Sequence, residues 1–335
     1  MELIIIVLLL FGIEVLYINL ATRFGIVDKP NERSMHAQLV LRGGGIIFTA
    51  AFLMFLVANS ILEISTIGNY LAFGIGFFII SMISFLDDLK SVSYKIRLAV
   101  HAIAVSFLLY FFTGFAEFPI WIYPFLLFLL VGIINAYNFM DGINGITGVY
   151  SLVLLFSLLY VNKEIVAFAD ERFIIYPILA CIVFLFFNFR KKAKIFLGDV
   201  GSVGIAFWIV ALLGLLIIKT DNFKWILFLS VYGVEVIFTI VERLFYKENI
   251  LKAHNKHLYD LLAGKWNIDH RWISLIYAFI QIIINIFVLK FTESKFVLFA
   301  FILLFASLMY VFFKLYFIKK ERMYPYPIAV TMVFA

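Results

Sequence analysis

Apolar stretches of about 20 residues recur from one end of the chain to the other, and short polar segments separate them. A run of this length is what an α-helix needs to cross the hydrocarbon core of a bilayer. A membrane β-barrel would instead show short segments of alternating polarity. We therefore predict an all-α, polytopic integral membrane protein with about eleven transmembrane helices. The predicted spans are 3–22, 45–63, 66–86, 97–115, 119–137, 145–161, 173–189, 201–218, 225–242, 272–290 and 296–317.

Composition agrees with this pattern. Of the 335 residues, 65% are hydrophobic and only 14% are charged, and the mean hydropathy is +1.08. These values exclude an ordinary soluble domain. We expect 3–22 to be a retained first helix, because no basic region precedes it and no small-residue cleavage site follows it. The single cysteine, Cys181, cannot form an internal disulfide.

The basic residues are distributed unevenly across the predicted membrane. Most of the 27 lysines and arginines lie in loops on one side, which the positive-inside rule assigns to the cytoplasm. This puts the N-terminus outside and the C-terminus in the cytoplasm, and the net charge of +6 then reflects topology rather than nucleic-acid binding. Residues 1–335 form a single transmembrane catalytic domain in this interpretation. Its active site is expected in the cytoplasmic loops, at about 23–44, 87–96, 138–144, 190–200 and 243–271.

The most unusual polar segment is Asn135-Ala-Tyr-Asn-Phe-Met-Asp-Gly-Ile-Asn-Gly, residues 135–145. Asn138 and Asp141 are three residues apart, so they share a face if the helix continues that far. Gly142 and Gly145 allow the backbone to leave the helix and to approach a ligand closely. Taken alone, the segment could equally be a polar loop with an Asp-Gly turn.

Two adjacent acids, Asp87 and Asp88, end the third predicted span. A helix C-terminus is the negative end of the helix dipole, and the two carboxylates also repel each other. A bound cation, a basic partner or a raised pKa would relieve this. The alternative is a solvated loop in which Lys90 and Lys95 neutralise the pair.

The first cytoplasmic loop is basic and ends in three glycines. Lys29, Arg33, His36 and Arg42 can offer positive charge near the lipid headgroups. Gly44 lies in the middle of the glycine triplet 43–45 before a helix, where free N–H groups favour an anion. The alternative is a positive-inside loop with a flexible hinge.

A second basic loop follows Asn188 and leads to Phe196 and Asp199. Its four basic residues can bind lipid headgroups. Phe196 lies beside a glycine-rich turn, where a nucleobase could stack, or it is an interfacial aromatic residue. Asp199 is a candidate ligand or acid, and it could also simply cap the next helix.

The last large loop carries His254 and His257, which are three residues apart. Zinc would need three or four ligands, so hydrogen bonds to a phosphate fit better, with Lys252 and Lys256 alongside. The segment 258–266 looks amphipathic and is predicted to lie on the membrane surface. Glu235, inside the preceding span, is a site or pairing candidate, whereas His101 is interpreted as structural.

Together these polar segments form one chemical pattern at one membrane face. Acidic groups combined with Arg, Lys and His favour a divalent cation that bridges phosphates. Mg²⁺ is preferred, with Mn²⁺ as the alternative, because Mg²⁺ is typically held by one or two carboxylates plus substrate phosphates. A site embedded at the membrane suggests a lipid partner, so the predicted chemistry is phosphoryl transfer.

Five motifs in this order carry a family resemblance. They are Asp28-x-Pro-x-x-Arg33-x-x-His36 with Gly43-Gly-Gly45, Asp87-Asp88, Asn135-x-x-Asn138-x-x-Asp141-Gly142, Phe196-Leu-Gly-Asp199-x-Gly-Ser202 and His254-x-x-His257. The pattern, over roughly residues 20–260, resembles the polyprenyl-phosphate N-acetylhexosamine-1-phosphate transferase superfamily. The resemblance implies a bacterial inner-membrane enzyme with a cytoplasmic active site. Such an enzyme transfers the sugar phosphate of a UDP-N-acetylhexosamine to undecaprenyl phosphate and releases UMP.

The resemblance also implies roles for single residues. Asp87, Asp88 and Asp141 would be the catalytic acids, and Asp199 with Asp87 would ligate Mg²⁺. The implied substrate-binding residues are Lys29, Arg33, His36, Gly44, Asn138, Asn188, Phe196, His254 and His257. A homodimer is a further expectation.

Departures from the family pattern narrow the expected substrate. Asn144 stands where the family often has Asp, and Glu235 stands where many members have Asp. The lone His254-x-x-His257 lacks the histidine run of the branch that uses UDP-MurNAc-pentapeptide. An enzyme that initiates O-antigen, capsule or teichoic-type polymers therefore fits better, with GlcNAc, FucNAc or QuiNAc as the sugar. A lipid-linked sugar flippase is the alternative from another class, and it would need polar groups through the membrane depth.

Overall fold

The computed structural model describes residues 2–28, 39–61, 67–250, 254–290 and 295–320. In these ranges the chain forms twelve α-helices and one small antiparallel pair of strands, β1 (Val27–Asp28) and β2 (Val40–Leu41). The helices are α1 (Glu2–Phe24), α2 (Ile46–Ile61), α3 (Ile67–Leu89), α4 (Tyr94–Thr113), α5 (Tyr123–Phe139), α6 (Ile146–Tyr160), α7 (Glu171–Asn188), α8 (Gly198–Thr220), α9 (Ser230–Phe245), α10 (Leu258–Gly264), α11 (His270–Lys290) and α12 (Lys295–Lys320). Three short turns of other helix types are η1 (Ile120–Ile122), η2 (Val161–Ile165) and η3 (Phe223–Leu229).

The predicted membrane architecture is confirmed. Each of the eleven predicted spans falls on one helix or on a helix with the short turn before it, and α10 is an additional short helix. Within the described ranges, nine helical segments are long and apolar enough to cross a bilayer, and α2 and the apolar part of α12 are shorter. The predicted span 225–242 is divided between η3 and α9, which follow each other without a break. The side of the membrane on which the termini lie stays a prediction.

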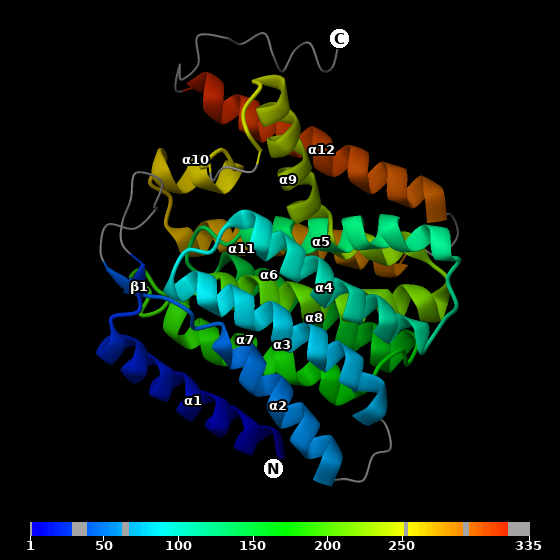
Figure 1. The fold of residues 1–335 in the computed structure, drawn as a ribbon. Coiled ribbons are helices and arrows are strands. Elements are labelled where there is room, and N and C mark those ends of the chain that lie inside the picture. Colours follow the sequence, from blue (N-terminus) through cyan, green and yellow to red (C-terminus); the bar gives the residue numbers. More distant parts are fainter. Residues whose placement is uncertain (1, 29–38, 62–66, 251–253, 291–294, 321–335) are drawn as a thin grey trace.

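Consecutive helices α1 to α8 run back and forth, and α3, α4, α5 and α8 pack side by side (Figure 1). Helix α8 lies at the centre, because nearly all of its side chains are buried. The alternation brings the C-terminal ends of α1, α3, α5 and α7 to the same end of the bundle as the N-terminal ends of α2, α4, α6 and α8. This end lies near β1 in Figure 1, and it carries the polar segments singled out from the sequence.

Helix α11 carries a polar stripe that crosses the bundle. Ser274, Tyr277, Gln281 and Asn285 are spaced three or four residues apart, so they share one face, and all four are buried. Their hydrogen bonds reach the Asn144 carbonyl, Glu235, Tyr150 and Ser157. Such bonds connect helices in a membrane, where no water replaces them. The stripe therefore fixes α11 against α6 and α9.

Helix α9 differs from its neighbours in direction and in surface. It is steeply inclined to α3, α4 and α5, and α12 packs against it (Figure 1). One of its faces exposes apolar side chains such as Ile237, Val241 and Leu244, while the other buries polar ones. An apolar outer face suits contact with lipid.

Candidate active site

Three carboxylates gather where α3 ends and α8 begins. The Arg42 guanidinium contacts Asp88 Oδ1 through Nε at 2.6 Å and Asp199 Oδ1 through Nη2 at 2.9 Å. Nη1 of Arg97, in the first turn of α4, lies 2.6 Å from Asp87 Oδ2 and 2.7 Å from Asp199 Oδ2. We refer to these five side chains, Asp87, Asp88, Asp199, Arg42 and Arg97, as the acid–arginine cluster.

Asp88 is unfavourable at the end of α3 but favourable at the start of α8. Its Oδ1 accepts a hydrogen bond from the Asp199 N–H at 2.8 Å, and its Oδ2 accepts one from the Val200 N–H at 3.0 Å. The first turn of a helix has free N–H groups and the positive end of the dipole. The carboxylate lies where a Cβ on Gly198 would be, 2.4 Å from that position, so only glycine fits there. Asp88 therefore joins α3 to α8, and its side chain is fully buried.

Two simpler explanations of these acids are wrong. The basic partners of Asp87 and Asp88 are arginines rather than Lys90 and Lys95. Asp199 lies inside the first turn of α8, whose N-cap is Leu197, so it does not cap the helix. Arg97 belongs to the cluster but lies outside the motifs that carry the family resemblance. The available signal was its position at the start of the span that follows the acids.

The glycine triplet joins two loops. The N–H groups of Gly44 and Gly45 donate to the Phe196 and Leu197 carbonyls at 2.9 and 2.8 Å. A Cβ on Gly45 would lie 1.9 Å from the Gly201 Cα, so α2 and α8 approach as only glycines allow. The Gly44 N–H predicted to meet an anion is thus occupied by a backbone carbonyl in this structure. The triplet instead fixes the loop so that Arg42, the residue before it, contacts the acids.

The segment 135–145 contacts the same helix start. Asn138 Nδ2 donates to Ser202 Oγ at 2.8 Å, and Ser202 Oγ donates to the Gly198 carbonyl at 3.1 Å. Asp141 follows α5 by two residues and is partly buried. It lies near enough to Asp199, Asp88 and Arg42 for their charges to affect its ionisation. Asn138 and Asp141 therefore belong to the site beside the acid–arginine cluster.

Asn135 and His101 lie one helical turn farther into the bundle than Asn138 and Arg97. Asn135 Nδ2 lies 3.4 Å from His101 Nδ1 and donates to the Val131 carbonyl at 2.8 Å. His101 is buried one turn after Arg97 on α4. It is thus a packed residue beneath the cluster, consistent with the structural role that we predicted.

Asn188 holds the turn after α5 against the second basic loop. Its Oδ1 accepts a hydrogen bond from the Gly145 N–H at 2.6 Å, and its Nδ2 donates to the Ile195 carbonyl at 2.8 Å. Gly145 has a φ of +84°, and the Phe189 ring occupies the place of its missing side chain. Both polar ends of the buried Asn188 amide are therefore engaged by backbone, which gives it a scaffold role in this structure. Phe196 is half-buried in the same loop.

The histidine segment, residues 254–260, lies against the turn after α5. The His254 and His257 rings are 4.9 Å apart, and the Tyr259 hydroxyl donates to the Phe139 carbonyl at 2.8 Å. A Cβ on Gly142 would meet that hydroxyl at 2.5 Å. The structure thus brings the two predicted histidines to the segment with Asn138 and Asp141.

Burial leaves both imidazoles neutral. Burial, together with the positive charges of Arg243 and Lys314, lowers the pKa of His254 to about 4. Burial also holds the pKa of His257 well below its usual range, helped by His254, Lys314 and Arg243. Near pH 7 each ring therefore offers one N–H donor and one acceptor instead of a positive charge.

The prediction that segment 258–266 lies on the membrane surface is wrong for helix α10. Residues 258–263 are all buried, so α10 is packed into the protein. The Asp260 carboxylate accepts a hydrogen bond from the His257 N–H at 3.1 Å and caps the helix. The amphipathic pattern of 258–266 reflects docking onto the turn after α5 instead of contact with lipid.

Some predicted site residues lie outside the described ranges. These are Lys29, Arg33, His36 and Lys252. Lys256 is described, and its ammonium group pairs with Glu248. The predicted binding roles of the first three residues stay predictions.

The acid–arginine cluster fits a magnesium ion that shares its ligands with a substrate. Asp87 Oδ2 and Asp199 Oδ2 both bind one nitrogen of Arg97, so a single cation can reach both carboxylates. No group of three or more His, Cys, Asp or Glu side chains in the described part of the chain could hold a metal by itself. Mg²⁺ commonly uses one or two carboxylates and completes its shell with phosphate oxygens and water. The donor set therefore fits Mg²⁺ better than a metal fully enclosed by protein.

The fold and the site together define a polytopic membrane protein with an acidic, arginine-bridged site at one end of its helix bundle. Residues 70–218 match the family model described as glycosyl transferase family 4. The chain is similar to the probable undecaprenyl-phosphate N-acetylglucosaminyl 1-phosphate transferase of Bacillus subtilis, with 28% identity over 80% of this chain and 78% of that protein. It is also similar to the undecaprenyl-phosphate alpha-N-acetylglucosaminyl 1-phosphate transferase of Thermotoga maritima, with 30% identity over 72% of this chain and 75% of that one.

The chain therefore belongs to glycosyl transferase family 4, and the resemblance to the polyprenyl-phosphate N-acetylhexosamine-1-phosphate transferase superfamily is confirmed. Proteins of the other branch are also similar, at a lower identity or over a shorter stretch. The phospho-N-acetylmuramoyl-pentapeptide-transferase of Thermotoga neapolitana is 27% identical over 66% of this chain and 75% of that protein. The phospho-N-acetylmuramoyl-pentapeptide-transferase of Streptococcus suis is 42% identical, but only over 89 residues and 25% of each chain.

The ionisation of Asp141 predicts a pH-dependent stability. Burial, together with the negative charges of Asp199 and Asp88, raises the pKa of Asp141 to about 7, although Thr147 and Arg42 oppose the increase. In the unfolded chain the group titrates near 3.8, so the stability of the protonated form is lost as pH rises through about 7. We expect the melting temperature to fall between about pH 5 and pH 7 and to level off above that, and Asp141→Asn to remove a few degrees of the fall.

A thiol-reactive dye can measure this unfolding, because Cys181 is buried in the folded protein. Asp269→Asn is the control, since Arg271 lowers the pKa of Asp269 to about 2 and the group stays ionised throughout that range. Equal pH dependence in wild type and Asp141→Asn would contradict the assignment.

Proposed function

We propose that the protein transfers an N-acetylhexosamine 1-phosphate from a UDP-sugar to undecaprenyl phosphate. An oxygen of the lipid phosphate attacks the sugar-bearing phosphorus, and the bond from that phosphorus to UMP breaks. UMP leaves with the electron pair, and an undecaprenyl diphosphate sugar stays in the membrane. The main support for this proposal is the acid–arginine cluster at the start of α8, in a chain of this family.

The cluster suits stabilisation of developing phosphate charge. Arg42 and Arg97 present planar donors that match phosphate oxygens, and preorganised charges of this kind are strong in a partly buried site. Asp87 and Asp199 would hold Mg²⁺, which would neutralise charge on the diphosphate. Asn138 lies beside them and can donate to the nucleotide sugar.

Accessibility separates the roles of the candidate acids. The Asp88 side chain is fully buried and accepts contacts from Arg42 and two backbone N–H groups, so it serves as an anchor. Asp87 and Asp199 keep 12% and 17% of their side chains exposed and can meet a ligand. The lipid phosphate needs no strong base, because a phosphate monoester with a second pKa of about 6 is already largely ionised at pH 7.

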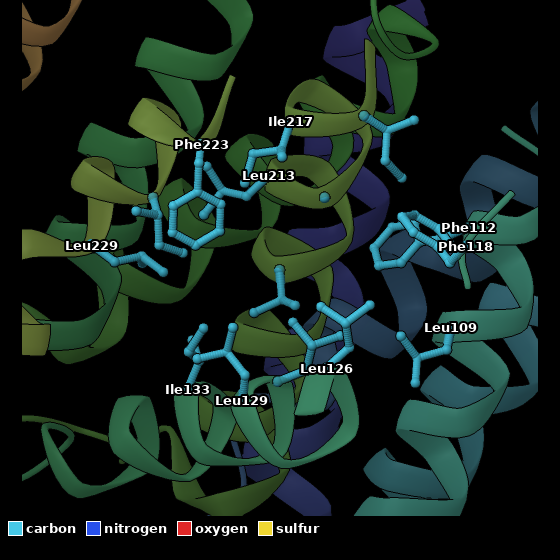
Figure 2. A pocket seen from close by; sticks show the side chains of 15 residues that line it. Leu109, Phe112, Phe118, Leu126, Leu129, Ile133, Leu213, Ile217, Phe223 and Leu229 are labelled. Atoms are coloured by element: carbon cyan, nitrogen blue, oxygen red, sulfur yellow. The ribbon is translucent and has the colours of Figure 1, made fainter. Parts of the chain in front are cut away.

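A pocket on the same helices suits part of a polyprenyl chain. It has a volume of about 110 Å³ and is lined only by apolar residues of α4, α5, α8, η3 and the connection before η1. In Figure 2, side chains such as Leu109, Leu126 and Leu213 surround it. Leu213 lies about 21 Å along α8 from Asp199, at 1.5 Å per residue. A lipid with its phosphate at the cluster can follow these helices toward the pocket.

Filling this pocket is expected to weaken the lipid substrate selectively. Leu213→Trp should raise the KM for undecaprenyl phosphate several-fold and leave the KM for the UDP-sugar unchanged, because indole takes the space of the chain. Phe128→Trp on α5 is the control, since Phe128 is 80% exposed and does not line the pocket. Equal changes in both KM values would contradict a lipid role for the pocket.

The setting follows the same proposal. We place the enzyme in the bacterial inner membrane with its site facing the cytoplasm, because UDP-sugars are cytoplasmic and the basic loops surround the site. Its product would initiate a cell-surface polymer of the lipopolysaccharide or cell-wall type. GlcNAc is the first sugar to test, because the names of both relatives specify N-acetylglucosaminyl transfer.

Two other functions have less support. The relatives of the pentapeptide-transferase branch match at 27% identity over 66% of this chain or over only a quarter of it. This chain also lacks the histidine run that the family resemblance associates with that branch. A flippase would need polar groups that can follow a headgroup across the membrane. The polar stripe of α11 crosses the bundle, but its groups are buried and bonded to neighbouring helices, as interhelical connections are.

The test is UMP release by the purified protein with Mg²⁺, undecaprenyl phosphate and a panel of UDP-sugars. Release with an acetamido sugar, dependent on the lipid, would support the proposal. Binding of UDP-sugars without turnover would point to a rarer acetamido donor. No binding and no release by well-folded protein would reject the transferase function.

A further inference from the structure

The inclined helix α9 carries a buried polar face. Tyr232, Glu235 and Thr239 are spaced three and four residues apart, so they point to the same side, and none is more than 2% exposed. Burying a carboxyl group among apolar helices is costly unless hydrogen bonds compensate. Glu235 has these bonds, and they all lead to elements around the histidine segment.

Glu235 fixes the backbone immediately after His257. Its Oε1 accepts a hydrogen bond from the Leu258 N–H at 2.6 Å, and its Oε2 accepts one from the Tyr277 hydroxyl at 2.5 Å. Tyr277 belongs to the polar stripe of α11. The carboxylate thus ties the start of α10 to two long helices.

His257 itself is held on one side of its ring. Its Nδ1 lies 3.3 Å from Thr239 Oγ1 and 3.8 Å from Glu235 Oε1, and the backbone N–H of His257 donates to the Asp260 carboxylate. The ring also stacks on Tyr259, with centroids 5.3 Å apart and planes 9° apart. Its Nε2 is buried and has no hydrogen-bond partner within the described ranges. One ring nitrogen is therefore positioned, and the other is left for a ligand.

The orientation of the ring matters because of where the segment is docked. Tyr259 bonds the Phe139 carbonyl at the end of α5, next to the turn that carries Asn138 and Asp141. The His254 ring lies 6.4 Å from the Phe139 ring. A small displacement of α10 would move His257 relative to the nucleotide-sugar side of the site.

We propose that Glu235, assisted by Thr239, is a positioning residue that acts through His257. It holds the imidazole so that the free Nε2 can meet the diphosphate of the donor. The inference rests on the proposed function and adds to it a specific role for Glu235, which the sequence offered only as a site or pairing candidate. Its consequence is that Glu235 matters for turnover only while His257 is present.

A double-mutant cycle on the full-length protein tests this, with UMP release as the readout. Glu235→Gln keeps the volume but replaces one accepting oxygen by an amide that cannot accept from Tyr277. We expect kcat to fall on the order of tenfold to a hundredfold, with a smaller change in the KM for undecaprenyl phosphate. His257→Ala should lower kcat at least as much, and the double variant should match His257→Ala alone.

Controls separate the possible failures. Glu171→Gln makes the same change at the opposite end of the bundle, where the carboxylate pairs with Lys163 at 2.7 Å, and it should leave activity unchanged. Dye labelling of Cys181 reports whether each variant is folded. If Glu235→Gln does not fold, Thr239→Val replaces it in the cycle, because it removes only the hydroxyl next to Nδ1.

The outcomes are distinct. A wild-type protein that releases no UMP rejects the proposed function itself. With an active wild type, a double variant whose loss equals the product of the single losses overturns the positioning role. An unchanged kcat in folded Glu235→Gln overturns it as well. A double variant equal to His257→Ala supports it.

Discussion

Asp199→Asn is expected to reduce UMP release on the order of a thousandfold. Asp199 is the carboxylate that both Arg42 and Arg97 contact, at 2.9 and 2.7 Å. The amide removes one negative charge from the acid–arginine cluster and one predicted ligand of Mg²⁺. It also places an N–H donor opposite a guanidinium, which has only donors. Both the metal and the arginines should therefore lose their geometry.

The same variant should remain folded, because the backbone N–H of residue 199 still donates to Asp88. Asp221→Asn is the matched control. It makes the same change at the other end of α8, where residue 221 has a φ of 46° that Asn tolerates well. Activity close to wild type in folded Asp199→Asn would reject the assignment of Asp199 to the metal.

Much of the fold was predictable because the membrane imposes simple rules. A helix must be about 20 apolar residues long to cross the bilayer, so hydropathy located the long helices. In the described ranges, nine helical segments are long and apolar enough to cross. Hydropathy does not report packing. The polar stripe of α11 could not be predicted, because its four residues are uncharged and interrupt no apolar run: Ser274, Tyr277, Gln281 and Asn285. The burial of α10 could not be predicted either, since an amphipathic segment has the same pattern against lipid and against protein.

The site was predictable in its members but not in its pairings. Asp88 looked unfavourable because its own helix ends there, while the structure places it on the first turn of α8. Arg97 is only ten residues from Asp87, yet nothing local indicates that it also reaches Asp199. Such pairings depend on how α3, α4 and α8 pack, and helix packing cannot be read directly from a single sequence. For Lys29, Arg33 and His36 the prediction stays untested, because they lie outside the described ranges.

Arg97→Gln is expected to lower kcat on the order of a hundredfold and to strengthen the response to Mg²⁺. The Nη1 of Arg97 lies between Asp87 and Asp199, on the two oxygens that we assign to the metal. A unit charge at about 4 Å changes an interaction by as much as about 4 kcal/mol at an effective dielectric constant of 20. Removing it leaves the two carboxylates with excess negative charge, so less Mg²⁺ should be needed for half-maximal residual activity, by about tenfold or more.

Two variants make this result interpretable. Arg97→Lys keeps the charge and loses the planar fork, so kcat should fall less and the Mg²⁺ response should stay close to wild type. Lys95→Gln removes an exposed positive charge from the same helix and should change neither. If Arg97→Gln needs more Mg²⁺ instead of less, arginine and metal do not share the oxygens of Asp87 and Asp199. The metal site would then have to be sought elsewhere, with Asp141 as the next carboxylate to replace, because it lies near enough to Asp199 for that charge to raise its pKa.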